Sequence, residues 1–324
     1  MGNAISYAAW TQSFWIPAPT LTEKNLPDQS GKVHIVTGGY AGVGEKLSQI
    51  LYSKGARVYV AGRSESKAQA AIERIQTACP NGPGELHFLK LDLADLSTIK
   101  ASADEFLTKE SRLDVLVNNA GVMFPPKGTK TAQDHDLQFG TNCLGPHLFT
   151  KYLHPILKKT AATAPPNTVR VIWASSLGIQ VLSPAGGVEL DSSNKLKNIN
   201  QVTNYAQTKV GNNLLAIKTQ ELLKDAGVVS TSFNPGNLRT ELARHTTGAG
   251  LISWMNYPSV MGAYTELWAG WSPEVTIESG ISFVMPWGRD GTPLVRRDIQ
   301  DGIKHHDLVE KFWNYCEAET TQFA

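Results

Sequence analysis

The chain has few cysteines, no long apolar run and almost no excess of charge. Its 324 residues include three cysteines and eight histidines, and neither type shows metal-ligand spacing. No apolar run approaches the roughly 18 residues that a membrane span needs. The 30 basic and 29 acidic residues are interspersed, so the sequence lacks the concentrated basic surface of a nucleic-acid-binding protein. The composition predicts a cytoplasmic globular protein that binds neither metal nor nucleic acid.

Residues 1–30 are interpreted as an N-terminal extension. Pro17 and Pro19 interrupt it and no basic start precedes them, so we expect no secretory signal. Met1–Ser6 fits the pattern for myristoylation of Gly2, but a single acyl chain gives only marginal binding, so we expect loose membrane contact at most. Apolar side chains follow at Trp10, Phe14, Trp15 and Ile16. They could sit at a lipid interface, but we expect them to cover an apolar patch of the domain.

Apolar strands and amphipathic helices alternate from Lys32 onward. Strands are expected at 33–36, 57–61, 86–91, 113–117, 169–174, 228–233 and 280–285. Helices are expected at 45–51, 66–77, 96–107, 133–158 and 204–224. This alternation predicts an α/β fold, a Rossmann-type doubly wound parallel sheet of about seven strands with helices on both faces. We expect one dinucleotide-binding catalytic domain over residues 31–324, ending in a helical tail.

A glycine-rich turn joins the first expected strand to the first expected helix. Thr37–Gly44 reads T-G-x-x-x-G-x-G. Glycine lets the backbone turn sharply and approach a pyrophosphate, and the following helix N-terminus presents free N–H groups to the anion. Many tight turns use glycine, but the strand and helix on either side predict a nucleotide site here.

The end of the second strand indicates which nucleotide binds. Dinucleotide sites often place an acidic residue here, where it holds the ribose hydroxyls, but this chain has Gly62-Arg63-Ser64. A guanidinium can form paired hydrogen bonds with the 2′-phosphate that distinguishes NADP. A solvated surface arginine is the alternative. We predict NADP(H) as the cofactor.

Polar or small residues also follow other strands. Asp92-Leu93 comes after the third strand, and Asn118–Gly121 after the fourth. The polar side chains could contact the edge of the adenine, and the small residues could let the backbone lie close to a flat ring. Alternatively, these residues only form turns. After the sixth strand, Pro235-Gly236 forces a turn and Thr240 could bond a carboxamide, with a plain turn as the alternative.

A candidate acid–base group follows the fifth strand. Ser175-Ser176 ends that strand, and Tyr205 and Lys209 come in the next helix, four positions apart on one face. A phenol has a pKa of about 10, which a neighbouring ammonium lowers. Of the nine tyrosines, only Tyr205 has lysine at this spacing. Asn142 lies inside the long expected helix, where it could bend the helix and present a carbonyl, or could be a surface or N-cap asparagine.

Together these motifs resemble the short-chain dehydrogenase/reductase family, in its single-domain branch, over about residues 30–290. The resemblance rests on Thr37-Gly38-x-x-x-Gly42-x-Gly44, Asn118–Gly121, Asn142, Ser176, Tyr205-x-x-x-Lys209 and Pro235-Gly236. It is strongest to retinol-dehydrogenase-like proteins, particularly filamentous-fungal reductases with a lead such as Trp15-Ile16-Pro17 and a tail like residues 312–317.

The resemblance implies a catalytic tetrad of Asn142, Ser176, Tyr205 and Lys209. In it, Tyr205 would exchange the proton with the substrate, Ser176 would bond the substrate oxygen, Lys209 would hold the nicotinamide ribose, and Asn142 would hold a water. The implied cofactor residues are Gly38, Tyr40, Gly42, Val43 and Gly44 at the pyrophosphate, Arg63 and Lys67 at the 2′-phosphate, Asp92 and Leu93 at the adenine, Asn119 and Ala120 on the adenosine side, and Pro235, Gly236, Leu238 and Thr240 at the nicotinamide.

Two long segments are expected to frame the substrate pocket. One runs from Leu177 to Asn204, and the other follows Thr240. The second contains Leu251, Ile252, Trp254, Met255 and Tyr257. Their apolar content favours a lipophilic ketone, aldehyde or alcohol, although the same residues could pack the fold or a partner subunit in a homodimer.

Two other functions are open to a chain with this fold. A sugar-nucleotide epimerase or dehydratase shares the tyrosine–lysine pair, but usually has T-G-x-x-G-x-x-G and a larger C-terminal domain. A nucleotide-sensing regulator typically loses tetrad residues, whereas this chain has all four. We therefore expect an oxidoreductase.

Overall fold

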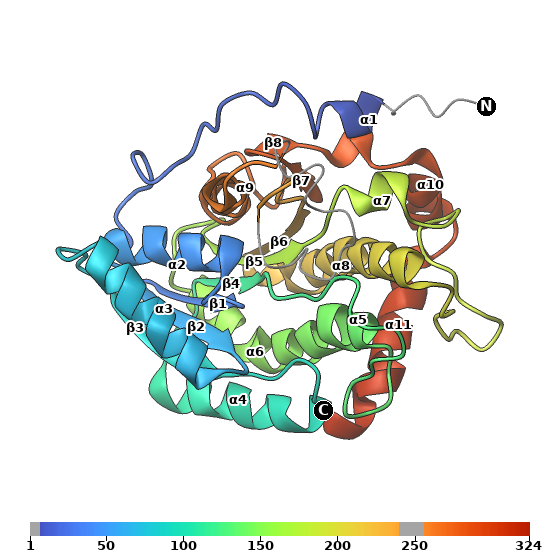
Figure 1. Ribbon diagram of the computed structural model, residues 1–324, viewed down its shortest axis with the longest axis horizontal. Helices are drawn as coiled ribbons and strands as arrows, with labels where there is room; N and C mark the ends of the chain where they lie inside the picture. Colours follow the sequence, from blue (N-terminus) through green and yellow to red (C-terminus); the bar gives the residue numbers. More distant parts are fainter. Residues whose placement is uncertain (1–6, 240–255) are drawn as a thin grey trace.

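The computed structural model describes residues 7–239 and 256–324, which are organised around one mixed sheet (Figure 1). The strand order is β3-β2-β1-β4-β5-β6-β7-β8, and every neighbouring pair is parallel except β7 and β8. The strands are β1 Val33–Thr37, β2 Arg57–Gly62, β3 Glu85–Lys90, β4 Val115–Asn118, β5 Val169–Ala174, β6 Val228–Phe233, β7 Phe283–Met285 and β8 Arg289–Asp290. The predicted doubly wound fold is confirmed, with eight strands instead of about seven. The additional strand, β8, has two residues, too few for a recognisable period-2 pattern.

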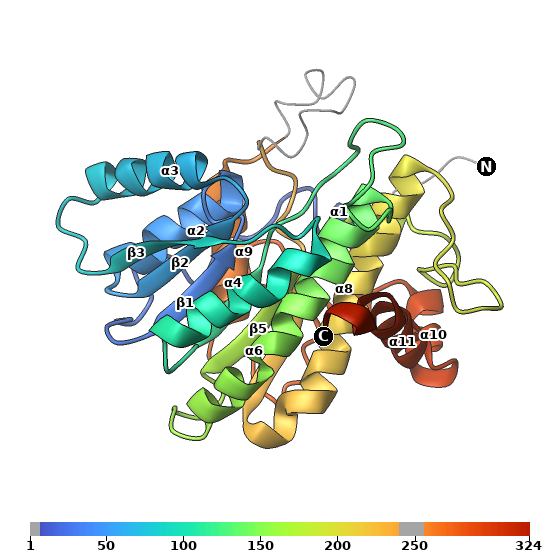
Figure 2. The same ribbon diagram turned by 90° about the horizontal axis from the view of Figure 1, so that it is seen from below.

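Helices cover both faces of the sheet. They are α1 Tyr7–Trp10, α2 Gly42–Ser53, α3 Glu65–Ala78, α4 Leu96–Lys109, α5 Leu137–Phe139, α6 Gly145–Ala161, α7 Gly178–Val181, α8 Gln201–Leu223, α9 Ser259–Trp271, α10 Arg297–His305 and α11 Leu308–Thr320. Figure 2 shows the sheet between α2 and α3 on one side and α4 and α6 on the other. Helix α9 packs against α2. Helix α8 lies on the same face of the sheet as α6, and α11 packs against α8. No helix among the described residues is long and apolar enough to cross a membrane.

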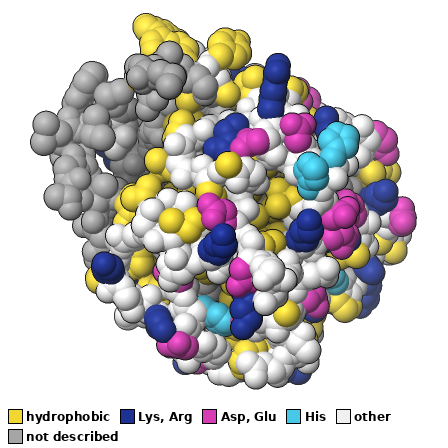
Figure 3. Space-filling model, turned by 90° about the vertical axis from the view of Figure 1, so that its right-hand side faces the viewer, with side chains coloured by type: hydrophobic (Ala, Val, Ile, Leu, Met, Phe, Trp, Pro, Cys, Tyr) yellow, Lys and Arg dark blue, Asp and Glu magenta, His cyan; other side chains and the backbone are white. Residues whose placement is uncertain are grey.

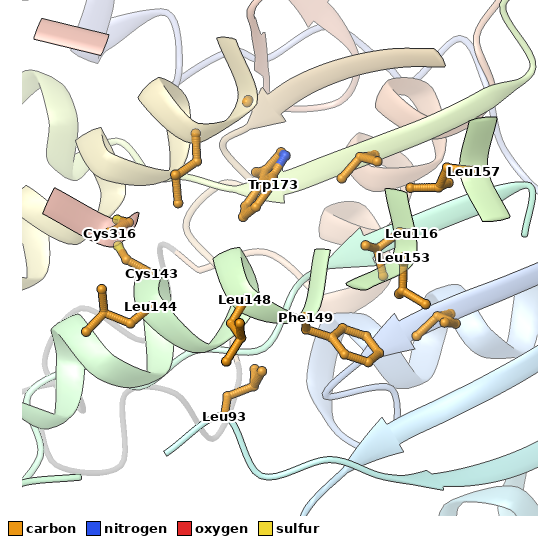
Figure 4. Packing of buried hydrophobic residues seen from close by; sticks show 14 of the residues in the cluster. Leu93, Leu116, Cys143, Leu144, Leu148, Phe149, Leu153, Leu157, Trp173 and Cys316 are labelled. Atoms are coloured by element: carbon orange, nitrogen blue, oxygen red, sulfur yellow. The ribbon is translucent and has the colours of Figure 1, made fainter. Parts of the chain in front are cut away.

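The strands are buried on both faces, which explains their continuous apolar sequences. In β1, Ile35 packs into the core on the α4–α6 side and Val36 into the core on the α2–α9 side. Figure 4 shows Leu148 and Phe149 of α6 in the same core as Trp173 of β5. Charged side chains of both signs are interspersed on the face shown in Figure 3.

The long helical stretch predicted over roughly residues 133–158 runs from Leu137 to Ala161 in the structure and is interrupted by one π-helical turn. The helical segment begins at Leu137, because the Asp136 side chain accepts hydrogen bonds from the N–H groups of Gln138 and Phe139 and so caps α5. A π-helical turn, η1 Gly140–Leu144, then separates α5 from α6. Such turns within helices often mark functional sites.

A side-chain cap also moves the start of α8. This helix was predicted to begin at Asn204, but it begins at Gln201. The Asn200 side chain accepts hydrogen bonds from the N–H groups of Val202 and Thr203, which satisfies the first turn. The start of this helix therefore depends on one short polar side chain.

The N-terminal segment is held by polar contacts, and its Trp15 side chain projects outward. The buried Gln12 accepts a hydrogen bond from Asn234, 2.9 Å from Nδ2 to Oε1, in the turn after β6. Trp10, Phe14 and Trp15 contact one another, yet Trp15 is 82% exposed. The expectation that these aromatics cover a patch of the domain is therefore wrong for Trp15. The myristoylation pattern at Met1–Ser6 lies outside the described residues.

Candidate active site

The candidate residues meet at one edge of the sheet. Strands β1, β4, β5 and β6 are neighbours in the sheet, and all are parallel. Their carboxyl ends therefore lie together, at the edge where ligands bind in doubly wound sheets. The glycine turn, the Asn118–Gly121 segment, Ser176 and the turn after Phe233 each leave one of these ends.

The glycine turn contains two glycines with positive φ and a third that leaves no space for a side chain. Gly38 and Gly42 have φ of +66° and +57°, in the left-handed region that favours glycine. A Cβ at Gly44 would lie 2.6 Å from the Gly38 carbonyl oxygen and 2.7 Å from Asn119 Nδ2. The α2 N-terminus that follows has no side-chain cap, so its first N–H groups stay available for an anion. This turn fits the pyrophosphate of a dinucleotide.

Asn119 and Ala120 hold the glycine turn in place. Asn119 Nδ2 donates to the Thr37 carbonyl at 2.8 Å, and the Ala120 N–H donates to Thr37 Oγ1 at 2.9 Å. Thr37 Oγ1 in turn donates to the Val117 carbonyl at 3.1 Å. These bonds connect the ends of β1 and β4, so the structure gives Asn119 a role in shaping the turn that the sequence did not reveal.

Basic side chains lie exposed at the end of β2. Arg63 directly follows the strand, and Lys67 lies in the first turn of α3. The Tyr40 ring crosses the strand end, because a Cβ at Gly62 would lie 2.2 Å from its Cε1 atom. Gly62 is therefore needed here by close packing. Asp92 Oδ1 accepts the Ala94 N–H at 2.9 Å and shapes the turn after β3.

The π turn buries Asn142 completely. Its Oδ1 accepts the Val122 N–H at 2.8 Å, and its Nδ2 donates to the Val122 carbonyl and to Thr208 Oγ1, each at 3.0 Å. These bonds join the exit of β4 to α8. The alternative of a surface or N-cap asparagine is wrong, since the residue has no exposed surface.

Tyr205, Lys209 and Ser176 form a compact group. Lys209 Nζ lies 5.5 Å from the centre of the Tyr205 ring. The same Nζ donates to the Ala174 carbonyl at 3.0 Å, and Asn212 Nδ2 donates to that carbonyl at 2.8 Å. Ser176 Oγ accepts the Gly178 N–H at 3.0 Å, and a Cβ at Gly178 would lie 3.5 Å from that oxygen and 3.8 Å from Tyr205 Cε1. The end of β5 and one face of α8 therefore place a phenol, a hydroxyl and an amine together.

Burial dominates the protonation of this group. It raises the pKa of Tyr205 to about 12, and the neighbouring Ser176 hydroxyl opposes the rise. Burial also lowers the pKa of Lys209 to about 8, with the Cys143 thiol opposing the fall. We predicted a lowered pKa for Tyr205. The direction is the opposite, because the loss of solvent around the phenol outweighs its polar neighbours.

The turn after β6 brings two predicted cofactor regions together. Gly236 has φ of +91°, and a Cβ there would lie 2.8 Å from the Trp287 ring. A Cβ at Gly262 in α9 would lie 2.3 Å from Leu238 and 2.9 Å from Val43. Leu238, predicted at the nicotinamide, therefore packs near Val43, predicted at the pyrophosphate. Thr240 and residues 251–255 lie outside the described part of the chain.

Two residues of the site were not predicted from the sequence. The Phe124 ring contacts the Tyr205 ring, with 5.4 Å between centres and 67° between planes. Thr208 joins Asn142 to α8. Both are close in sequence to recognised motifs, but no pattern marks either one. Within residues 7–239 and 256–324, no group of three or more His, Cys, Asp or Glu side chains could hold a metal ion.

The chain is similar to short-chain dehydrogenases in sequence and in structure. The family model for short chain dehydrogenase matches residues 32–249. A short-chain dehydrogenase/reductase from Phomopsis amygdali is 45% identical over 97% of both chains. A short-chain dehydrogenase/reductase from Emericella nidulans is 42% identical over 94% of this chain and 97% of its own. Among solved structures, a metagenomic short-chain oxidoreductase in complex with NADP is 26% identical, with a TM-score of 0.56 over 79% of this chain and 96% of its own.

Proposed function

Since the chain belongs to the short-chain dehydrogenase/reductase family, we propose that it is an NADP(H)-dependent oxidoreductase that interconverts a carbonyl and an alcohol. The observation that carries the proposal is the grouping of Ser176, Tyr205 and Lys209 at the sheet edge that also carries the glycine turn. A bound nicotinamide would supply or accept the hydride.

The proton step is assigned to Tyr205. In reduction its hydroxyl donates a proton to the carbonyl oxygen, and in oxidation the phenolate takes the proton from the alcohol. Ser176, which lies beside the phenol, donates to the same substrate oxygen. The buried Lys209 ammonium stabilises the phenolate and contributes to holding the nicotinamide ribose. Asn142 would hold a water of the proton relay, and its side-chain amide is bonded at both ends, which leaves the backbone carbonyl for that role.

The choice of NADP(H) over NAD(H) is assigned to Arg63 and Lys67. Both are exposed where β2 ends, and no carboxylate follows the strand at Gly62–Ser64. The guanidinium and ammonium fit the two negative charges of a 2′-phosphate. A solved relative of the same fold carries NADP, which supports the assignment.

We propose a small lipophilic substrate. The segment from Leu177 to Asn204 displays apolar side chains, with Val181 51% exposed and Leu182 41% exposed five and six positions after Ser176. An apolar rim of this kind favours a lipophilic ligand. Residues 31–324 are proposed to act as one catalytic domain, in a cytoplasmic enzyme with loose membrane contact at most.

The proposal is tested with a panel of ketones and aldehydes. Purified protein is mixed with NADPH or NADH and each carbonyl compound, and cofactor oxidation is followed by absorbance. We expect NADPH oxidation with lipophilic members and slower oxidation of NADH. Failure of every carbonyl compound, together with failure of the corresponding alcohols and NADP⁺, would overturn the proposed activity.

Mass spectrometry of the protein from its native cell would decide whether Gly2 is acylated.

A further inference from the structure

Phe124 has a backbone conformation that its side chain disfavours. Its φ is +50°, in the left-handed region that bulky residues rarely enter. Its ring meets the Tyr205 ring nearly edge to face, with 5.4 Å between centres and 67° between planes. The residue lies on the segment that leaves β4, six positions after Asn118. A strained aromatic residue thus touches the candidate proton donor.

A set of hydrogen bonds holds the strained segment. The Phe124 N–H donates to Gln138 Oε1 at 3.0 Å, and Gln138 is fully buried in α5. Gln138 Nε2 donates to the Gln201 carbonyl at 2.9 Å. Gln201 Nε2 in turn donates to the carbonyl of Pro125. The start of α5 and the start of α8 therefore fix the backbone on both sides of the ring.

Burial in the hydrophobic core does not explain the position of the Phe124 ring. Tyr205 is 6% exposed, whereas the Phe124 side chain is only half-buried, so part of its ring stays available beside the phenol. Strained backbone costs free energy and persists only where surrounding contacts over-determine it, commonly at functional sites. A carbonyl compound whose oxygen reaches the Tyr205 hydroxyl must place its substituents near this ring.

We propose that Phe124 is a specificity-determining residue that favours carbonyl substrates with a flat, unsaturated ring beside the carbonyl over saturated substrates of equal size. Aromatic rings attract one another in edge-to-face and offset stacked arrangements, which a puckered saturated ring cannot adopt. The assignment rests on the proposed carbonyl–alcohol activity and adds the class of substrate. Phe124 acts by contact with the substrate and takes no part in proton transfer.

The test compares benzaldehyde with cyclohexanecarbaldehyde in wild type and Phe124→Leu. Leucine keeps an apolar side chain of similar reach and removes the aromatic ring. We expect the ratio of kcat/KM for benzaldehyde to kcat/KM for cyclohexanecarbaldehyde to fall about threefold to tenfold in this variant. Leu222→Ala, at the exposed far end of α8, is the control and should keep the wild-type ratio.

Two further variants separate the ring from the backbone. Phe124→Gly removes the ring and tolerates a positive φ, whereas Phe124→Ala removes the ring and keeps the disfavoured backbone. We expect Phe124→Gly to unfold at a higher temperature than Phe124→Ala, and both to lose the preference for benzaldehyde. Phe124→Gly therefore keeps the test usable if larger substitutions reduce folding.

The possible outcomes are distinct. An unchanged ratio in both Phe124→Leu and Phe124→Gly, with both aldehydes reduced, overturns the role of Phe124 and leaves the proposed activity intact. If the wild type reduces neither aldehyde, the flat-ring preference is also overturned. In that case the wider carbonyl panel shows whether the proposed activity fails with it.

Discussion

Asn142 Nδ2 and Thr208 Oγ1 lie 3.0 Å apart in a buried hydrogen bond that joins residues 66 positions apart in the chain. Thr208 Oγ1 donates its own proton to the Tyr205 carbonyl at 2.7 Å. One hydroxyl therefore links the π turn to the helix that carries the tyrosine–lysine pair. Because Thr208 lies between Tyr205 and Lys209 in the sequence, this link also positions the proposed catalytic helix face against Asn142.

Replacing Thr208 with valine should weaken this link with little change of shape. Asn142 Nδ2 then loses one of its two partners in a site without solvent, which costs about 1–3 kcal/mol in the free energy of unfolding. Turnover should fall more than affinity for NADPH, because the cofactor turn is not touched. Urea denaturation and steady-state kinetics measure the two effects. Thr208→Ser restores the hydroxyl and should recover both, so equal behaviour of the two variants would contradict the prediction.

Replacing Tyr205 with phenylalanine should remove turnover and spare cofactor binding. The variant keeps the ring against Phe124 and loses only the hydroxyl. General acid–base groups contribute about 10²–10⁴-fold to rates, so kcat should fall by about that factor. Fluorescence titration with NADPH should give an unchanged Kd. Tyr264→Phe, which removes a phenol in α9, is the matched control, and near-normal kcat in Tyr205→Phe would mean that another group delivers the proton.

Replacing Arg63 with alanine should shift the preference between the two cofactors. Only NADP carries the 2′-phosphate, so loss of the guanidinium should raise KM for NADPH by about tenfold to a hundredfold, with little effect on NADH. Arg297→Ala removes an exposed arginine from the start of α10 and serves as the control for net charge. If the ratio of the two KM values is the same in Arg63→Ala and wild type, the 2′-phosphate lies elsewhere.

Glu266 in α9 should make stability depend on pH. It is fully buried, and neither carboxylate oxygen has a hydrogen-bond partner among the described residues. Burial holds its pKa well above the ordinary value of 4.5, so the folded chain keeps a proton that the unfolded chain releases. The free energy of unfolding therefore falls as pH rises above that ordinary value.

Glu266→Gln removes this dependence. Above about pH 5, the stability of the variant relative to wild type should rise by about 1.4 kcal/mol for each pH unit over which folded wild type keeps the proton. Urea denaturation at several pH values measures the difference. Parallel stability curves for the two proteins would show that Glu266 is ionised in the folded chain.

Local patterns determined much of the fold. The strands at Val169–Ala174 and Val228–Phe233 have the predicted bounds, because continuous apolar runs between turn signals are a local property of parallel strands buried on both faces. The seventh strand was predicted to begin at Gly280 but begins at Phe283. The continuous apolar run also starts only at Phe283. Family membership also followed from local spacing, since the glycine turn, Asn118–Gly121 and the tyrosine–lysine pair are each short segments.

The sequence by itself determined the alternation of strands and helices, the glycine turn and the pairing of Tyr205 with Lys209, because each depends on residues close together in the chain. Only the tertiary structure decided that Asn142 is buried in a π turn, that the pKa of Tyr205 rises, and that Phe124 lies against the phenol. These properties depend on contacts between residues tens of positions apart and on the loss of water around them. The spacing of residues along the chain does not reveal which distant residues come into contact or which of them lose contact with water.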